Sequence, residues 1–124
     1  MERPKLKGRA VLVVEDEPLI AMEIMEAFQK AGALVTMTTA LRQALILVEH
    51  DGLAVAILDH ALNDGDSTEL YLRLKERDIP FVIYSGFPEV SGIAAEAPLV
   101  QKPARADVLI ETVEALLPPA PDKT

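Results

Sequence analysis

The chain has 124 residues, 50% of them hydrophobic, which is enough for one domain with a buried core and too apolar for extensive disorder. Its formal net charge of −8, without a dense basic segment, disfavours direct binding to nucleic acid, because phosphate contacts need clustered lysine and arginine. With no cysteine and only two histidines, the chain offers neither a disulfide framework nor a thiolate or histidine-rich metal site.

A polar lead over residues 1–9 precedes the first apolar run, residues 10–14. This run is too short for a signal peptide or a membrane span, so we expect a cytoplasmic protein without membrane contact. The run predicts a buried strand instead. A helix is predicted next, because Pro18 suits a first helical position, apolar residues recur at helical spacing up to Ala31, and Gly32 follows.

Strands and helices alternate in the same way along the rest of the chain. Residues 87–98 are the exception, because two prolines and a central glycine leave room for one short helix at best. The alternation predicts parallel strands with helices on both faces of the sheet. We therefore expect one three-layer α/β domain over residues 10–117, followed by a proline-rich tail or linker start at 118–124. The remaining predicted strands are at 33–36, 53–58, 81–84 and 99–101. The remaining predicted helices are three: one begins at Thr38 or Thr39, one follows Asp66 as its cap, and one begins near residue 104.

The apolar run Leu53–Leu58, which ends on Asp59, is the centre of the predicted sheet. A short continuous apolar run indicates a strand buried on both faces. A carboxylate at the carboxyl end of such a strand lies where open α/β sheets bind ligands. Asp59 is therefore a candidate reacting group, and a simple turn-capping role is the alternative.

Other polar residues reach the same edge of the predicted sheet: Glu15 and Asp16 after the first strand, Ser85 after the fourth and Lys102 after the fifth. Each of them alone has an ordinary role, as a helix cap, a turn hydroxyl or a surface lysine. Together they suit phosphoryl transfer to a carboxylate. Crowded carboxylates attract a hard divalent cation such as Mg²⁺, and a lysine helps to neutralise the phosphoryl group in flight. Aspartate is a known nucleophile that forms acyl phosphates.

Five short motifs follow one another along the chain: Val13-Val-Glu-Asp-Glu-Pro18, Ile57-Leu-Asp59, Asn63-Asp-Gly65, Tyr84-Ser-Gly86 and Lys102-Pro103. In this order they resemble the response-regulator receiver domain of two-component signalling. The resemblance covers about residues 10–117 and implies a flavodoxin-like (βα)5 fold with strand order 2-1-3-4-5.

The resemblance also implies a role for each site residue. Asp59 is the expected phosphoacceptor, Ser85 the switch hydroxyl and Lys102 the contact to the phosphoryl group. The Lys102–Pro103 peptide bond is expected to be cis. The expected ligands of Mg²⁺ are Glu15, Asp16, Asp59 and the backbone carbonyl of Ala61.

The function implied is a switch that receives a phosphoryl group on Asp59 from a histidine kinase or a histidine phosphotransfer protein. Such a domain assists its own phosphorylation and dephosphorylation and is not otherwise an enzyme. It passes the signal to a downstream protein partner or to an output domain. One alternative is a degenerate receiver that binds proteins independently of phosphorylation. Another is a metal-dependent hydrolase or nuclease, which the small apolar Ala61 and the lack of an obvious general base disfavour.

The sequence departs from the usual family pattern in three places. Leu99 stands where the family often has an aromatic switch residue, Gly86 follows Ser85 where alanine is usual, and the fourth helix is short. These features are similar to a group of mostly stand-alone receivers of proteobacteria. Because Gly86 offers a flexible step, we expect the backbone of residues 85–96 to rearrange on phosphorylation, unless Gly86 only fits a tight turn.

Overall fold

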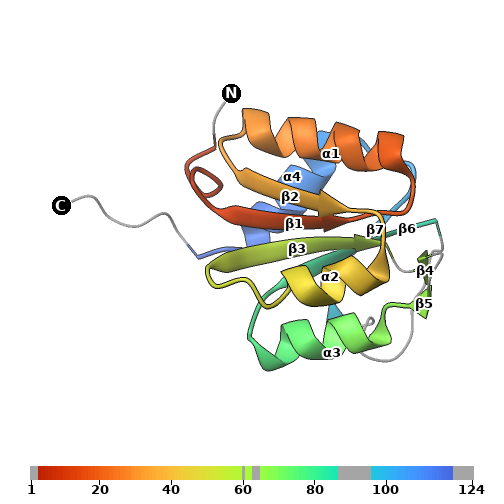
Figure 1. The fold of residues 1–124 in the computed structure, drawn as a ribbon. Helices are drawn as coiled ribbons and strands as arrows, with labels where there is room; N and C mark the ends of the chain where they lie inside the picture. Colours follow the sequence, from red (N-terminus) through yellow and green to blue (C-terminus); the bar gives the residue numbers. More distant parts are fainter. Residues whose placement is uncertain (1–2, 60, 63–64, 87–95, 119–124) are drawn as a thin grey trace.

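The computed structural model describes residues 3–59, 61–62, 65–86 and 96–118. Figure 1 shows a central twisted sheet with helices on both faces. In space, the strands of this parallel sheet follow the order β2-β1-β3-β6-β7, which confirms the predicted order 2-1-3-4-5 and the three-layer α/β architecture. The strands are β1 (Ala10–Val14), β2 (Leu34–Thr38), β3 (Leu53–Asp59), β6 (Phe81–Ser85) and β7 (Leu99–Gln101).

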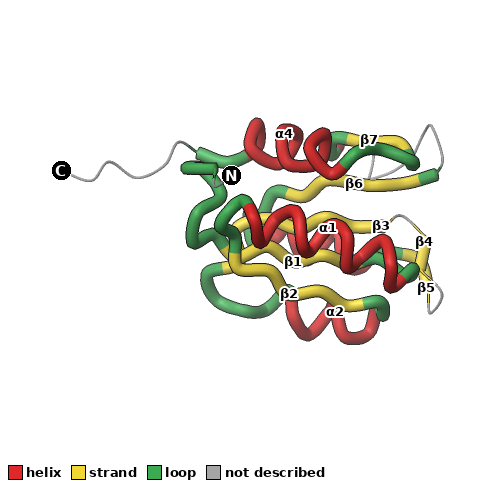
Figure 2. The backbone as a smooth tube through the Cα atoms, turned by 90° about the horizontal axis from the view of Figure 1, so that it is seen from above, coloured by secondary structure: helices red, strands yellow, loops and turns green. Residues whose placement is uncertain are grey.

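The described helices form two layers, one on each face of the sheet (Figures 1 and 2). The helices α1 (Pro18–Lys30) and α4 (Ala106–Leu116) cover one face, and α2 (Leu41–Leu47) and α3 (Thr68–Glu76) cover the other. Side chains of a strand point alternately to the two faces. In β3, Val55 and Ile57 therefore pack with α1 and α4, whereas Ala56 and Leu58 pack with α2 and α3. This double burial explains the continuous apolar run of β3.

The predicted helix starts were close but not correct at two positions. Thr38 ends β2 instead of opening α2, although its hydroxyl accepts a hydrogen bond from the Ala40 N–H at 3.2 Å and so shapes the entry to the helix. The N-cap of α3 is Ser67 and not Asp66. The Ser67 hydroxyl donates to the backbone oxygen of Asp59 at 3.2 Å, which ties the start of α3 to the end of β3.

Two short strands, β4 (Ala61–Leu62) and β5 (Gly65–Asp66), pair antiparallel to one another after β3. The short helix predicted within residues 87–98 falls mostly on residues 87–95, which lie outside the described residues, as do most of the residues predicted to rearrange on phosphorylation. Among the helices of the described part, none has the length and apolar character needed to cross a membrane.

The polar lead packs against the body of the domain through one apolar side chain. Leu6 is completely buried and belongs to the core on the α1 and α4 face. The backbone N–H of Arg3 donates to the Ala31 oxygen at 2.8 Å, and the Arg3 guanidinium pairs with Glu114 of α4 at 2.8 Å. The lead therefore connects the carboxyl end of α1 with α4. A single buried leucine in a polar segment carries no periodicity that a sequence pattern could reveal.

We expect Leu6→Ala to lower the free energy of unfolding by about 2 kcal/mol, because it removes apolar contacts and leaves a cavity at the edge of the core. Urea unfolding followed by circular dichroism measures the change. Leu34→Ala is the matched control, since the Leu34 side chain is 64% exposed and its loss should change the stability little. Equal losses in both variants would show that the lead is not part of the core.

Candidate functional site

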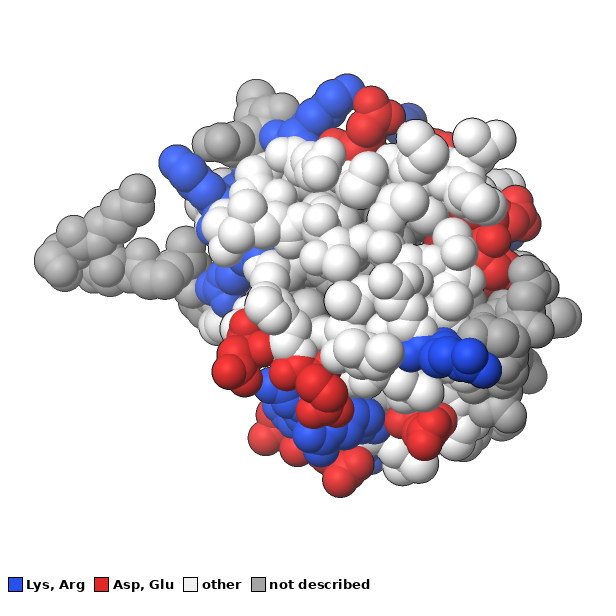
Figure 3. All heavy atoms as spheres, in the orientation of Figure 1, with Lys and Arg blue, Asp and Glu red and all other residues white. Residues whose placement is uncertain are grey.

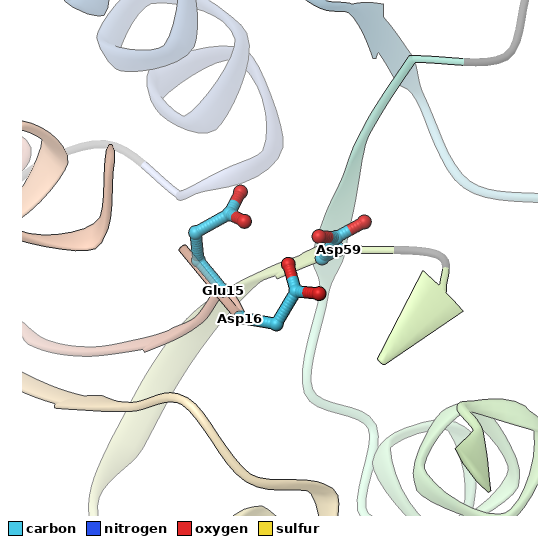
Figure 4. Close-up of side chains that lie close together, drawn as sticks. All are labelled: Glu15, Asp16 and Asp59. Atoms are coloured by element: carbon cyan, nitrogen blue, oxygen red, sulfur yellow. The ribbon is translucent and has the colours of Figure 1, made fainter. Parts of the chain in front are cut away.

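Three carboxylates meet at the edge of the sheet where β1 and β3 end. Glu15 and Asp16 directly follow β1, and Asp59 is the last residue of β3. Figure 4 shows the side chains of Glu15 and Asp16 on the side of β1 that faces Asp59. One carboxylate oxygen from each residue lies within 4.8 Å of the other two. Glu15 is only 1% exposed and Asp59 7%, while Asp16 is half-buried and gives the cluster its opening to solvent.

Backbone contacts fix the positions of these carboxylates. The Glu15 N–H donates to the Thr38 oxygen at 3.1 Å, which extends the β1–β2 pairing to the acidic residue. The Glu17 N–H, at the N-cap of α1, donates to Glu15 Oε2 at 3.1 Å. On the other side, Asp59 is in register with Tyr84 of β6. The site is therefore built on strand ends and on a helix start, which are rigid parts of the fold.

Lys102 brings a positive charge into the acidic cluster. Its backbone N–H donates to the Ser85 oxygen at 2.7 Å, and the Lys102–Pro103 peptide bond is cis, as predicted. The ammonium nitrogen lies 3.2 Å from Asp59 Oδ2, as a hydrogen bond, and 2.8 Å from Glu15 Oε1. The contact to Glu15 is an ion pair, and apart from it the buried Glu15 Oε1 has no polar partner among the described residues.

Burial and mutual repulsion alter the protonation of these groups. Burial raises the pKa of Glu15 to about 7, although Lys102 and the Glu17 N–H act in the opposite direction. Burial and the neighbouring Asp16 also raise the pKa of Asp59. Burial by itself disfavours the charged form of Lys102, but Glu15 and Asp59 outweigh this effect and raise the pKa of the ammonium group. The cluster thus holds excess negative charge that a second cation would relieve.

The raised pKa of Glu15 predicts that the metal-free protein loses stability as the pH rises. The folded protein binds the Glu15 proton more tightly than the unfolded chain does, so this stabilisation is complete below pH 4.5 and is lost as the pH passes about 7. We expect the free energy of unfolding to fall between about pH 5 and pH 8, and to fall less in Glu15→Gln, which has no proton to lose. Urea titrations in EDTA measure both. An equal fall in the two proteins would contradict the altered protonation of Glu15.

The other predicted site residues lie at the same edge. Ser85 ends β6, is 1% exposed and pairs with Gln101 of β7. The backbone of Ala61 belongs to β4, two residues after Asp59, and its role as a carbonyl ligand stays a prediction. A Cβ atom built on Gly86 meets no heavy atom of the described residues within 4 Å, so crowding by these residues does not explain the glycine after Ser85.

Sequence reasoning did not single out Tyr84, which contacts Lys102 directly. The Tyr84 ring lies beneath the ammonium nitrogen, with 5.4 Å between Nζ and the ring centroid. The phenol oxygen accepts a hydrogen bond from the Ala104 N–H at 3.0 Å and donates to the Ala104 oxygen at 3.2 Å. The available signal was the aromatic residue directly before the predicted switch hydroxyl, but nothing in the sequence pairs it with a lysine 18 positions later.

The donor set fits a hard divalent cation. Carboxylate oxygens are the ligands that Mg²⁺ prefers, and this ion usually keeps several waters, so few protein ligands suffice. The buried Glu15 Oε1, whose partner among the described residues is the Lys102 ammonium at 2.8 Å, is a natural ligand position. Figure 3 shows acidic side chains exposed at the right-hand edge, where the strands of Figure 1 end, and such an edge attracts cations.

Comparisons with known proteins give matches over most of the chain. A family model described as the response regulator receiver domain matches residues 11–114. The photosynthetic apparatus regulatory protein RegA of Rhodobacter capsulatus is 25% identical over 122 residues, which cover 90% of this chain but only 66% of that relative's length.

Solved structures of similar proteins share the fold over most of the chain. The BeF3-activated conformation of SdrG from Pseudomonas melonis Fr1 is 35% identical with a TM-score of 0.72, over 86% of this chain and 94% of that one. A CheY-like receiver domain protein from Methanospirillum hungatei JF-1 is 20% identical with a TM-score of 0.79, over 89% of this chain and 94% of that one. At this lower identity the likeness concerns the fold alone.

Proposed function

Because the chain belongs to the response regulator receiver domain family, we propose that it is a phosphorylation-operated signalling switch whose phosphoacceptor is Asp59. The observation that carries this proposal is the convergence at one sheet edge of three carboxylates within 4.8 Å of one another and a lysine ammonium 3.2 Å from Asp59. The complete set of charged groups favours active phosphoryl chemistry over a degenerate receiver that only binds proteins.

The proposed reaction is a displacement at phosphorus. An oxygen of the ionised Asp59 carboxylate forms a bond to phosphorus while the bond to the donor's leaving group breaks, and the product is an acyl phosphate. Glu15, Asp16 and Asp59, with the Ala61 carbonyl, are the residues that would hold Mg²⁺. When bound, Mg²⁺ supplies positive charge to the phosphoryl oxygens.

Lys102 and Ser85 act on the phosphoryl group from the protein side. The Lys102 ammonium, now shared between Glu15 and Asp59, is close enough to donate to a phosphoryl oxygen on Asp59 after a small movement. The Ser85 hydroxyl is the second donor, because Ser85 lies one position beyond the residue that pairs with Asp59. The domain thereby assists its own phosphorylation and dephosphorylation and is not otherwise an enzyme.

The partners follow from this chemistry. The donor is a histidine kinase or a histidine phosphotransfer protein in the cytoplasm, and the reader is a downstream protein or an output domain. SdrG, at 35% identity, has been solved in a BeF3-activated conformation, which supports a phosphoryl-responsive site in this chain as well. The relative RegA is a regulatory protein by name, but the match spans only 66% of its length, so its output is not assigned to this chain.

Intact-mass spectrometry tests the proposed function. The protein is incubated with acetyl phosphate in Mg²⁺ and, separately, in EDTA. We expect one added phosphate per chain in Mg²⁺ and much slower uptake in EDTA, because the carboxylates then repel the incoming phosphoryl group. A protein that takes up no phosphate in Mg²⁺ acts as a binding module and not as a phosphoacceptor.

Asp16→Asn should weaken Mg²⁺ binding by more than about tenfold, because it removes the full ligand charge of the most accessible carboxylate in the cluster. Isothermal titration of the phosphate-free protein measures the affinity. Asp78→Asn is the matched control, since Asp78 is exposed and precedes β6 at the opposite edge of the sheet. Equal affinities for Asp16→Asn and the wild type would remove Asp16 from the site.

A further inference from the structure

We propose that Tyr84 is a positioning residue for Lys102, whose ring holds the lysine ammonium at the acidic cluster and whose hydroxyl fixes the backbone after the lysine. The inference rests on the proposed function, since the role of Lys102 in phosphoryl transfer is part of that proposal. Tyr84 lies in β6 directly before Ser85 and is 6% exposed, among the core residues on the α1 and α4 face.

The ring limits where the ammonium group can go. Lys102 Nζ lies 5.4 Å from the ring centroid, within the range of an attractive cation–π contact. The same nitrogen contacts Glu15 and Asp59, so three strand ends, those of β1, β3 and β6, surround it. An ammonium group can donate three hydrogen bonds. The aromatic face attracts its positive charge although the ring carries no formal negative charge. The contact therefore holds the lysine while donors stay available for a phosphoryl oxygen.

The hydroxyl of Tyr84 fixes the loop that carries Lys102. It accepts from the Ala104 N–H at 3.0 Å and donates to the Ala104 oxygen at 3.2 Å. Two residues earlier in the loop, the Lys102 N–H donates to the Ser85 oxygen at 2.7 Å. Adjacent residues of β6 thus hold the loop on both sides of the Lys102–Pro103 bond, and one of the two attachments is a tyrosine side chain.

The space around the ring gives the lysine an alternative position if the ring is removed. A cavity of about 180 Å³ between α1 and α4 is lined by Tyr84, Lys102, Pro103 and Leu109, among others. A smaller residue at position 84 would enlarge this cavity and remove the surface on which the ammonium rests. The lysine side chain would then turn toward the cavity and spend less time at the carboxylates.

Proton NMR of the phosphate-free, metal-free protein tests the position of the lysine directly. An aromatic ring current shifts protons above its face upfield, so the ε-methylene signal of Lys102 should lie upfield of the ε-methylene signals of the other lysines. The signal that is missing from the spectrum of Lys102→Arg is assigned to Lys102. We expect the shift to persist in Tyr84→Phe, which keeps the ring, and to vanish in Tyr84→Leu and in Tyr84→Met, whose side chain is longer and unbranched. In Tyr84→Phe, hydrogen exchange of the Ala104 amide should become faster, because its acceptor is lost.

Phosphorylation by acetyl phosphate gives the functional readout. We expect Tyr84→Leu and Tyr84→Met to react about fivefold more slowly than the wild type, the size of effect typical of a lost cation–π contact. Tyr84→Phe should recover most of the rate. The matched control is Tyr71→Leu, which removes a buried ring stacked on Phe81 on the opposite face of the sheet and should not slow the reaction.

A Lys102 signal that is not shifted upfield in the wild type, or that stays shifted in both ring-deleted variants, overturns the proposal. A full rate in both of these variants, or an equal loss in Tyr71→Leu, overturns it as well. Failure of the proposed function gives a different result, because the wild type would then take up no phosphate. The NMR shifts are recorded without a phosphodonor, so they would still report where Tyr84 holds the lysine.

Discussion

Asp59→Asn is expected to take up no phosphate from acetyl phosphate under conditions in which the wild type takes up one. The amide has nearly the shape of the carboxylate but is not nucleophilic, so the acyl phosphate cannot form. Asp59 is the carboxylate that ends the central strand, contacts Lys102 at 3.2 Å and belongs to the acidic cluster. Replacing it therefore removes the acceptor without enlarging or emptying the site.

The matched control for this prediction is Asp51→Asn, whose side chain is fully exposed in the turn before β3. This variant should be phosphorylated like the wild type. The measurement is intact mass over a time course in Mg²⁺, with the folding of each variant checked by circular dichroism. Uptake by Asp59→Asn at the rate of the wild type would place the phosphoryl group on another residue.

Lys102→Met should slow phosphorylation about a hundredfold, comparable with the loss in enzymes of one preorganised donor to a developing charge. The same change should strengthen Mg²⁺ binding. The Lys102 ammonium lies 2.8 Å from Glu15 and 3.2 Å from Asp59, so it competes with a second cation for the same carboxylates. Opposite effects on the reaction and on metal affinity distinguish a lysine that acts on the phosphoryl group from one that only stabilises the site.

Metal affinity for this comparison is best measured near pH 9, because loss of the lysine raises the proton affinity of Glu15, whose pKa is already about 7. Lys75→Met is the control, since Lys75 forms an exposed ion pair with Glu96. This variant should leave both quantities unchanged. A Lys102→Met protein with an unchanged reaction rate would exclude Lys102 from phosphoryl transfer.

The sheet and the composition of its functional edge could be predicted because both follow from local patterns. The apolar runs ending at Val14, Leu58 and Tyr84 are long enough to identify as strands, and parallel topology brings their carboxyl ends to one edge. The residue that follows each run is therefore placed near the others by the fold class alone. The strand pattern alone therefore predicts that Glu15 and Asp59 lie close together.

Contacts between distant residues could not be predicted in the same way. Leu6 is buried because the lead folds across the end of α1, and no repeat around it marks this position. The Tyr84 contact with Lys102 joins β6 to the loop after β7, and its geometry depends on side-chain directions that spacing does not encode. Likewise, the choice of Ser67 over Asp66 as the N-cap of α3 depends on where β5 ends.

The central claim is that Asp59 carries the phosphoryl group as an acyl phosphate, and chemical trapping tests it most directly. The phosphorylated protein is reduced with borohydride, which converts an aspartyl phosphate to homoserine, and peptide sequencing by tandem mass spectrometry locates the change. We predict homoserine at position 59 only, and none when Mg²⁺ is replaced by EDTA during phosphorylation. Homoserine at position 16 or another acidic residue, or phosphate that resists reduction, would contradict the account.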